Sequence, residues 1–359
     1  MAVGQALRPV RHAGCTGPAL RPAGVWPPGR LPPPLMIRLS LLCQCLLVAL
    51  LLTCLGSLLH GSGIVWAMLH GNQTLPALQL QLLLQLRLPR LLVAICSGML
   101  LSSAGAAIQA RFRNPLAEPG LLGIYSGAAL AAALALSLGA GILPVSLAGF
   151  AGSLLTLWLI RLLASPNGNG SRLILSGVAI SALLGSLLTL LITTLPDGAL
   201  RSITFWLMGS FSNAEWPQAW LLLLATPLVW LGLFRQWRLL NALQLGEATA
   251  FHLGFDIRRG AWLVVCLASI AAGVVVSSCG MIGFVGLLAP HLTRLLTGSD
   301  ARRLLLAAPL LGAWLTVSAD WLARSLLAPA ELPVGVITSL LGAPFFLWLL
   351  RREQESPRA

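Results

Sequence analysis

The chain has 359 residues, of which 57% are hydrophobic and only 9% are charged. A soluble domain of this size carries about a quarter charged residues, so these few charges cannot cover a water-facing surface. We therefore expect most of the chain to lie in lipid. The net charge is +13, and every basic residue is an arginine. Because no loop is long enough for a nucleic-acid recognition module, this charge indicates the cytoplasmic loops of a membrane protein and no nucleic-acid partner.

Residues 1–35 differ from the rest of the chain, with eight prolines, four arginines and no acidic residue. Such a stretch is too polar and too rich in proline to form a helix or a core, and it lacks the apolar centre of a targeting signal. We expect it to be either a disordered cytoplasmic tail or an over-extended gene start, with Met36 as the natural first residue. Residues 36–359 are predicted to form the membrane domain.

Ten apolar segments of membrane length follow, which predicts an all-α polytopic membrane protein. The predicted spans are Leu39–Leu59, Leu91–Ala110, Leu121–Leu138, Ile142–Leu163, Leu173–Leu195, Gln218–Phe234, Ala261–Ser278, Met281–Leu296, Leu304–Leu327 and Val334–Leu350. Small residues at spacing four (Gly98, Ser102 and Ala106; Gly123 and Gly127) predict close contacts between helices.

The placement of arginine supports this count of spans. With the N-terminus in the cytoplasm, fifteen arginines fall on the cytoplasmic side and four on the opposite side, namely Arg87, Arg90, Arg201 and Arg324. Cytoplasmic loops carry the excess of basic residues in membrane proteins. We therefore expect both termini to be cytoplasmic.

The sequence contains no HExxH, GxSxG or P-loop motif, and its seven cysteines form no CxxC pair. We expect no catalytic residues, no metal ligands and no cofactor, so the chain is not predicted to be an enzyme. Asp320 is the one acid deep within an apolar run, and Arg324 follows it by one helical turn. Such a pair neutralises itself, which argues against an ion-coupled carrier with buried acids.

The cytoplasmic loop Arg235–Gly260 is long and patterned as two short helices broken by glycine. It contains Leu245-Gly246-Glu247-Ala248 and then Leu253-Gly254. A loop of this kind is suited to a groove on a soluble partner, although an ordinary connector would show the same pattern.

Several motifs resemble the permeases of the iron-chelate and cobalamin class of ABC importers, from about Met36 to Arg352. They are Arg87-Leu-Pro-Arg90, Gln109 with Asn114–Gly123, Trp206-Leu-Met-Gly209, Leu245–Ala248 with Leu253-Gly254, Gly283-Phe-Val-Gly286 with Pro290-His291 and Arg294, Glu331-Leu-Pro-Val-Gly335, and Gly342-Ala-Pro-Phe345. The segments Asn114–Gly123 and Ala330–Gly335 most resemble the cobalamin (vitamin B12) permease. Haemin and ferric-siderophore permeases share much of the same sequence.

The resemblance implies the permease subunit of an ATP-driven importer in the cell inner membrane. Such a subunit pairs with a second copy, binds two copies of an ABC ATPase and receives a large metal chelate from a periplasmic binding protein. Gly246, Glu247, Ala248, Leu253 and Gly254 match the segment that contacts the ATPase.

Two further sites follow from the same resemblance. Gly170 and Ser171 match the cytoplasmic gate, where the cobalamin member has two hydroxyl residues and only Ser171 agrees. Asn167–Gly170 is also simply a good turn sequence. Arg87, Arg90 and Arg324 match arginines that meet glutamates of the binding protein. The alternative role for these arginines is to anchor the chain to membrane lipid.

Overall fold

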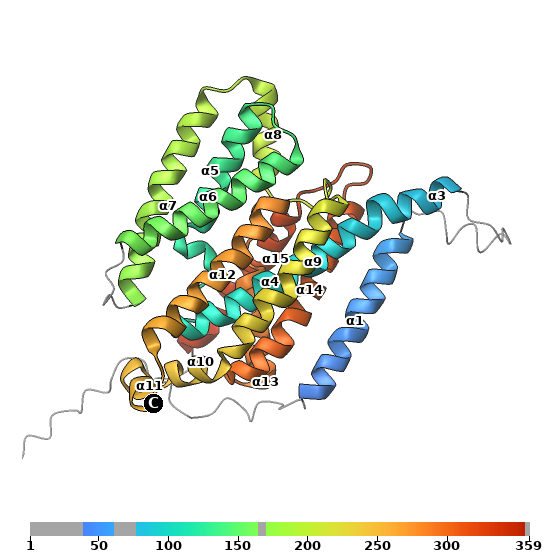
Figure 1. Cartoon of the computed structure of the whole chain (residues 1–359). Helices are drawn as coiled ribbons and strands as arrows, with labels where there is room; N and C mark the ends of the chain where they lie inside the picture. Colours follow the sequence, from blue (N-terminus) through green and yellow to red (C-terminus); the bar gives the residue numbers. More distant parts are fainter. Residues whose placement is uncertain (1–38, 61–76, 164–169, 356–359) are drawn as a thin grey trace, which may run out of the picture. The chain divides into compact units, whose positions relative to one another are not determined.

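The computed structural model describes residues 39–60, 77–163 and 170–355. Within these ranges all regular structure is helical, in agreement with the predicted all-α class (Figure 1). The N-terminal half contains α1 (Leu39–Leu59), α3 (Ala77–Leu82), a π-helical turn η1 (Leu83–Arg87), α4 (Leu88–Phe112), a short 3-10 helix η2 (Pro119–Leu122), α5 (Ile124–Ser137), α6 (Ile142–Leu163) and α7 (Gly170–Thr193). The C-terminal half contains α8 (Asp197–Leu207), α9 (Trp216–Arg235), α10 (Trp237–Gln244), α11 (Glu247–His252), α12 (Ile257–Cys279), α13 (Val285–Thr297), α14 (Ala301–Ser325) and α15 (Val334–Glu355).

Each of the ten predicted segments coincides with a helix. Within the described ranges, seven helices are long and apolar enough to cross a membrane. The other three, α5, α13 and the apolar part of α15, are shorter than a membrane span. The chain is thus a polytopic membrane protein, while the count of ten spans and the cytoplasmic termini stay predictions. The residues 1–35 and Met36 lie outside the described ranges.

Some helix boundaries differ from the prediction for identifiable reasons. The second predicted span begins much earlier, at Ala77, and passes through η1 before α4. The proline at position 89 has no N–H to donate, and a π-turn just before it accommodates the missing bond. The helix α13 begins at Val285 instead of Met281, because Gly280 and Phe284 have the positive φ values of 74° and 65°.

Helix α4 is the centre of the bundle. It packs against α14, α12, α9 and α13, and 83% of its most apolar stretch is buried, compared with 11% for α7. The α4–α14 contact depends on glycine, since a Cβ atom at Gly98 would overlap the carbonyl oxygen of Gly312. Small residues allow helices to approach this closely where lipid provides no hydrophobic drive. The predicted close contact at Gly98 and Ser102 is therefore confirmed.

Candidate functional site

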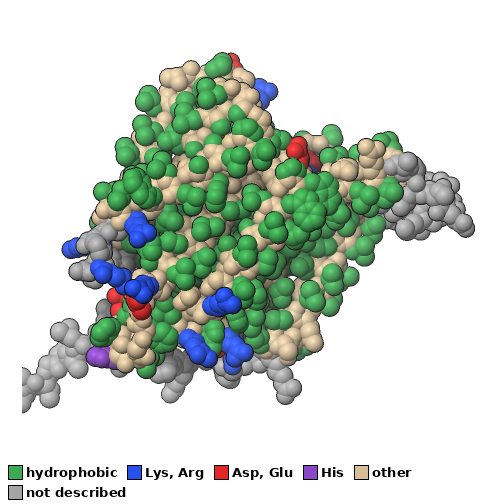
Figure 2. All heavy atoms as spheres, in the orientation of Figure 1, with side chains coloured by type: hydrophobic (Ala, Val, Ile, Leu, Met, Phe, Trp, Pro, Cys, Tyr) green, Lys and Arg blue, Asp and Glu red, His purple; other side chains and the backbone are tan. Residues whose placement is uncertain are grey.

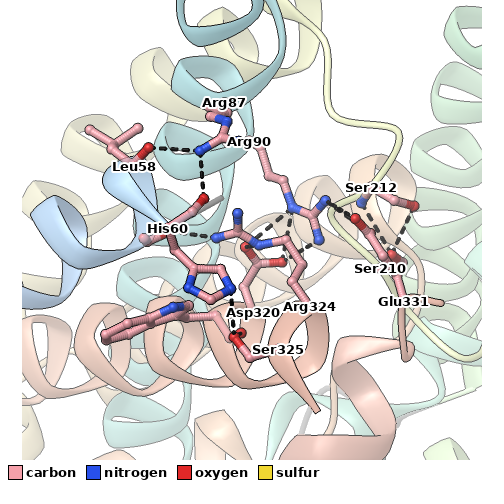
Figure 3. Close-up of polar contacts among 12 residues, drawn as sticks. Leu58, His60, Arg87, Arg90, Ser210, Ser212, Asp320, Arg324, Ser325 and Glu331 are labelled. Carbon is pink, nitrogen blue, oxygen red and sulfur yellow. Dashed lines mark hydrogen bonds and ion pairs between the residues drawn. The ribbon is translucent and has the colours of Figure 1, made fainter. Parts of the chain in front are cut away.

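Arg87, Arg90 and Arg324 lie together, although they come from separate parts of the chain (Figure 3). Arg87 ends η1, Arg90 lies in the first turn of α4, and Arg324 lies in the last turn of α14. Two carboxylates, Asp320 and Glu331, complete the group. We call these five residues the arginine–carboxylate cluster.

Arg90 is bound on two sides. Its Nε and Nη2 donate to Oδ1 of Asp320 over 3.0 and 2.8 Å, and its Nη1 donates to Oε2 of Glu331 over 3.0 Å. The Asp320 side chain is only 4% exposed, whereas that of Glu331 is 42% exposed. Asp320 is thus the buried partner that fixes Arg90, and Glu331 is the partner that water or another molecule can reach.

Arg324 shares the same carboxylate. Its Nε lies 3.2 Å from Oδ2 of Asp320, which confirms the pair predicted from their i,i+4 spacing. Its Nη2 donates to the hydroxyl of Ser57 on α1. Arg87 also binds this helix end, because its Nη1 donates to the carbonyl oxygens of Leu58 and His60 over 2.8 and 2.7 Å. The cluster therefore joins α1, α4, α14 and the segment before α15.

The sequence prediction included the three arginines but neither carboxylate as a site residue. The structure leaves Arg90 and Arg324 with side chains only 12% and 14% exposed, so they are not freely extended arginines. Glu331 stood in the motif Glu331–Gly335, and Asp320 was the only acid deep in an apolar run. Those two signals could have identified both carboxylates.

The predicted ATPase-contact segment lies at the end of the bundle that carries α10 and α11 (Figure 1). As predicted, two short helices are broken by a glycine, Gly246, with a φ of 117°. After α11 ends, Gly254 has a φ of 85° and its N–H donates to the carbonyl of Phe251, while Phe255 N–H donates to that of Ala250. This pair of bonds is a Schellman motif, in which glycine is strongly favoured.

Side chains hold this segment to the rest of the bundle. Nη1 of Arg111, in the last turn of α4, lies 2.8 Å from Oε1 of Glu247 at the start of α11. Asn241 of α10 donates through Nδ2 to Oδ1 of Asp300 over 2.8 Å and accepts from the backbone N–H of Ala301. The side chains of Leu245, Phe251 and Leu253 in this segment are exposed. A fixed segment with exposed apolar side chains is suited to contact another protein.

Several other motif residues form structural contacts. Arg294 donates through Nη2 to Oε1 of Gln109 over 3.0 Å, so α13 is tied to α4. A Cβ atom at Gly209 or Gly335 would overlap a backbone carbonyl oxygen, of Met281 and Met208 respectively, so the motifs Trp206–Gly209 and Glu331–Gly335 meet at that point. Burial raises the pKa of the Glu118 carboxyl, which belongs to the Asn114–Gly123 motif.

The predicted gate residues Gly170 and Ser171 form the start of α7, and the preceding residues 164–169 lie outside the described ranges. In the part of the chain that the structure describes, no three His, Cys, Asp or Glu side chains gather in a way that could hold a metal ion.

The number of long helices and their apolar faces define a polytopic membrane protein. The comparisons identify its family: residues 43–352 match the model of the FecCD transport family, and the chain belongs to it. It is a multi-pass membrane permease of a bacterial ABC importer, and its role is transport and not catalysis.

Two curated relatives have similar identity to this chain. The hemin transport system permease protein HmuU of Yersinia pestis is 41% identical over 339 residues, which are 91% of this chain and 98% of the relative. The vitamin B12 import system permease protein BtuC of Pectobacterium atrosepticum is 40% identical over 314 residues, which are 86% of this chain and 93% of the relative.

A solved structure has the same fold. It is an inward-facing conformation of a metal-chelate type ABC transporter, with a TM-score of 0.79 and 34% sequence identity. The match covers 87% of this chain and 99% of the chain in that structure.

Proposed function

We propose that this chain moves a large metal chelate from a periplasmic binding protein across the inner membrane, and that cobalamin is the first candidate substrate. The observation that carries the proposal is the likeness of Asn114–Gly123 and Ala330–Gly335 to the cobalamin permease, together with 40% identity to BtuC. Hemin is the second candidate substrate, because HmuU matches 91% of the chain. A ferric siderophore is the third member of the same chemical class.

The test is uptake into liposomes that contain the permease with its ATPase and binding protein. Cobalamin should accumulate only when ATP is present on the ATPase side, and hemin should not. Accumulation of hemin alone would replace the first candidate by the second. Uptake driven by an ion gradient without ATP would contradict the whole proposal.

The proposed ATPase contact is the segment Gly246, Glu247, Ala248, Leu253 and Gly254. Its support is the pair of short helices, the anchoring by Arg111 and Asn241, and the exposed side chains of Phe251 and Leu253. In an importer with two ATPase subunits, each copy of the permease would present one such segment.

The proposed contact for the binding protein is the arginine–carboxylate cluster. It holds three arginines and two acids, which leaves an excess of positive charge for an acidic partner. Since Glu331 is the exposed partner of Arg90, we expect a glutamate of the binding protein to take its place. Glu331 contacts only Nη1 of Arg90, while Asp320 holds Nε and Nη2, so a carboxylate of the partner can take the place of Glu331 without displacing Asp320.

The proposed homodimer would use surface that a single copy leaves uncovered. The helix α7 is the least buried of the seven candidate membrane spans. The hydroxyls of its Ser186 and Thr189 donate to backbone carbonyls of the same helix. The gate proposal places Ser171 at the start of this helix. Cysteine at position 171 should crosslink to its copy in at least one nucleotide state, and failure in every state would contradict the gate.

A further inference from the structure

One face of α9 exposes a row of leucines that ends in an arginine. The row is Leu221, Leu224, Leu228 and Leu231, with Arg235 next, and their spacing of three and four residues places them on one side of the helix. All of these side chains are exposed, and Leu228 is 71% exposed. An apolar strip of this kind fits the acyl chains of a lipid lying along the helix.

Beyond Arg235, two more arginines gather around one indole ring. The guanidinium carbon of Arg238 lies 5.2 Å from the ring centroid of Trp237, and that of Arg302 lies 5.6 Å from the same ring. Trp237 begins α10 and Arg302 lies in the first turn of α14, so the group joins two helices. Figure 2 shows basic side chains gathered at this end of the face in view, below a largely hydrophobic surface.

No carboxylate neutralises this group within the described residues. None of Arg235, Arg238 and Arg302 forms an ion pair there. Asp300 is the nearest acid in sequence, but its carboxylate accepts from the Arg302 backbone N–H and pairs at 3.8 Å with Arg303. Like charges held around one ring repel each other, and a bound anion would remove that cost.

We propose that Arg235, Trp237, Arg238 and Arg302 bind the phosphate of an anionic phospholipid whose acyl chains lie along the leucine row of α9. Tryptophan is favoured at the boundary between membrane and water, and arginine binds phosphate with paired hydrogen bonds. Basic pockets between membrane helices bind anionic headgroups on the same electrostatic grounds. An acidic protein partner would account for the arginines but not for the leucine row that leads to them.

The test compares phosphatidylglycerol with phosphatidylcholine of identical acyl chains. Native mass spectrometry counts the lipids retained by the purified chain, and thermal unfolding in mixed micelles measures the stabilisation. The site variant is Arg235→Gln/Arg238→Gln/Arg302→Gln. The matched control is Arg172→Gln/Arg201→Gln/Arg351→Gln, which removes the same charge from three exposed arginines elsewhere.

Phosphatidylglycerol should raise the melting temperature of the wild type and the control by several degrees more than phosphatidylcholine, and this preference should be lost in the site variant. If the triple variant does not fold, the single variants Arg238→Gln and Arg302→Gln replace it in the test. Each should retain several-fold less phosphatidylglycerol than the wild type. In Leu224→Ser/Leu228→Ser, long-chain phosphatidylglycerol should bind more weakly.

Three results would overturn the proposal. The first is equal stabilisation of the wild type by both lipids, and the second is a preference that survives in the site variants. The third is stabilisation by glycerol phosphate alone as strong as that by the lipid, which would indicate a phosphate site without a lipid. If the site variant keeps its lipid preference but no longer assembles with the ATPase, the arginines serve a protein contact.

Discussion

Nη1 of Arg111 lies 2.8 Å from Oε1 of Glu247, so the last turn of α4 is bound to the first residue of α11. These residues are 136 positions apart in the sequence. The Arg111 side chain is 14% exposed and that of Glu247 is 44% exposed, which places the pair at the edge of the bundle. The pair connects the central helix directly to the proposed ATPase contact.

Breaking the Arg111–Glu247 pair should weaken the coupling between the permease and its ATPase. Arg111→Gln or Glu247→Gln should leave the basal ATPase rate of the complex nearly unchanged and reduce its stimulation by the binding protein. A charge-assisted pair at a partly exposed site contributes about 1 kcal/mol, so the expected loss is roughly fivefold. The measurement is ATP hydrolysis with and without binding protein.

The exchanged variant Arg111→Glu/Glu247→Arg should recover part of the stimulation, because it restores opposite charges. Arg113→Gln is the matched control, since Arg113 is exposed and forms no ion pair with any described residue. Equal loss in the control, or no recovery in the exchanged variant, would show that the pair is not specific to coupling.

Gly254→Leu should uncouple ATP hydrolysis from uptake. No atom lies within 4 Å of a Cβ built at this position, so the substitution adds no clash, but the φ of 85° disfavours any residue with a branched or bulky side chain. The cost is about 1 kcal/mol, enough to change the orientation of α11. Asparagine tolerates this backbone conformation, so Gly254→Asn should keep most of the uptake per ATP hydrolysed. Normal uptake by the leucine variant would refute the proposed role of this turn.

Charge changes in the arginine–carboxylate cluster should act in opposite directions. Arg90→Glu should weaken association with the binding protein and reduce its dependence on salt, because an exposed charge pair is screened by ions. Glu331→Gln should strengthen association several-fold, because it removes the carboxylate that competes for Arg90. Binding kinetics at two or more salt concentrations measure both effects.

The two variants differ in their effect on the fold. Arg90→Glu leaves Asp320 with Arg324 alone, and breaking a buried pair costs about 3–5 kcal/mol, so its thermal stability must be measured as well. Glu331→Gln changes an exposed side chain and avoids this problem. Arg201→Glu is the control for a general effect of charge on the same predicted side. Unchanged affinity in both cluster variants would support lipid anchoring by these arginines instead.

Gly98→Ala should lower the stability of the bundle. Its Cβ would overlap the Gly312 carbonyl, and forcing α4 and α14 apart costs roughly 1–3 kcal/mol. Gly185→Ala is the matched control, because nothing lies within 4 Å of its Cβ and alanine is the better helix former. The melting temperature in detergent should fall by several degrees for the first and stay level or rise for the second. A similar melting temperature for both would show that the helices can separate freely.

The sequence predicted the helices well because each span is a nearly continuous run of leucine, valine and alanine. It missed α3 and η1, with which the second predicted span begins, since Gln79, Gln81 and Gln85 interrupt the apolar pattern there. Helix α8 was missed for a related reason: with Asp197 and Arg201 in its first turns it is too polar to stand out as a span.

The contacts within the candidate sites also differ in whether a local sequence pattern predicts them. Asp320 and Arg324 were predicted as a pair because they are four residues apart on one helix. The pair Arg90–Asp320 spans 230 positions and joins α4 to α14, which are in close contact at Gly98 and Gly312. No local pattern encodes such a contact, so only the packed structure could reveal it.

Helix α4 runs without a break for 25 residues, which is about 37 Å at the rise of an α-helix. Arg90 binds carboxylates near its first turn and Arg111 binds another in its last turn. A helix is stiff along its axis, and this one is surrounded by packed neighbours. We therefore expect it to move as a rigid body of fixed length. If nucleotide binding displaces one end, the other end must move too. Thermodynamic reciprocity then requires that a docked binding protein change the nucleotide affinity of the ATPase by the same factor as nucleotide changes docking.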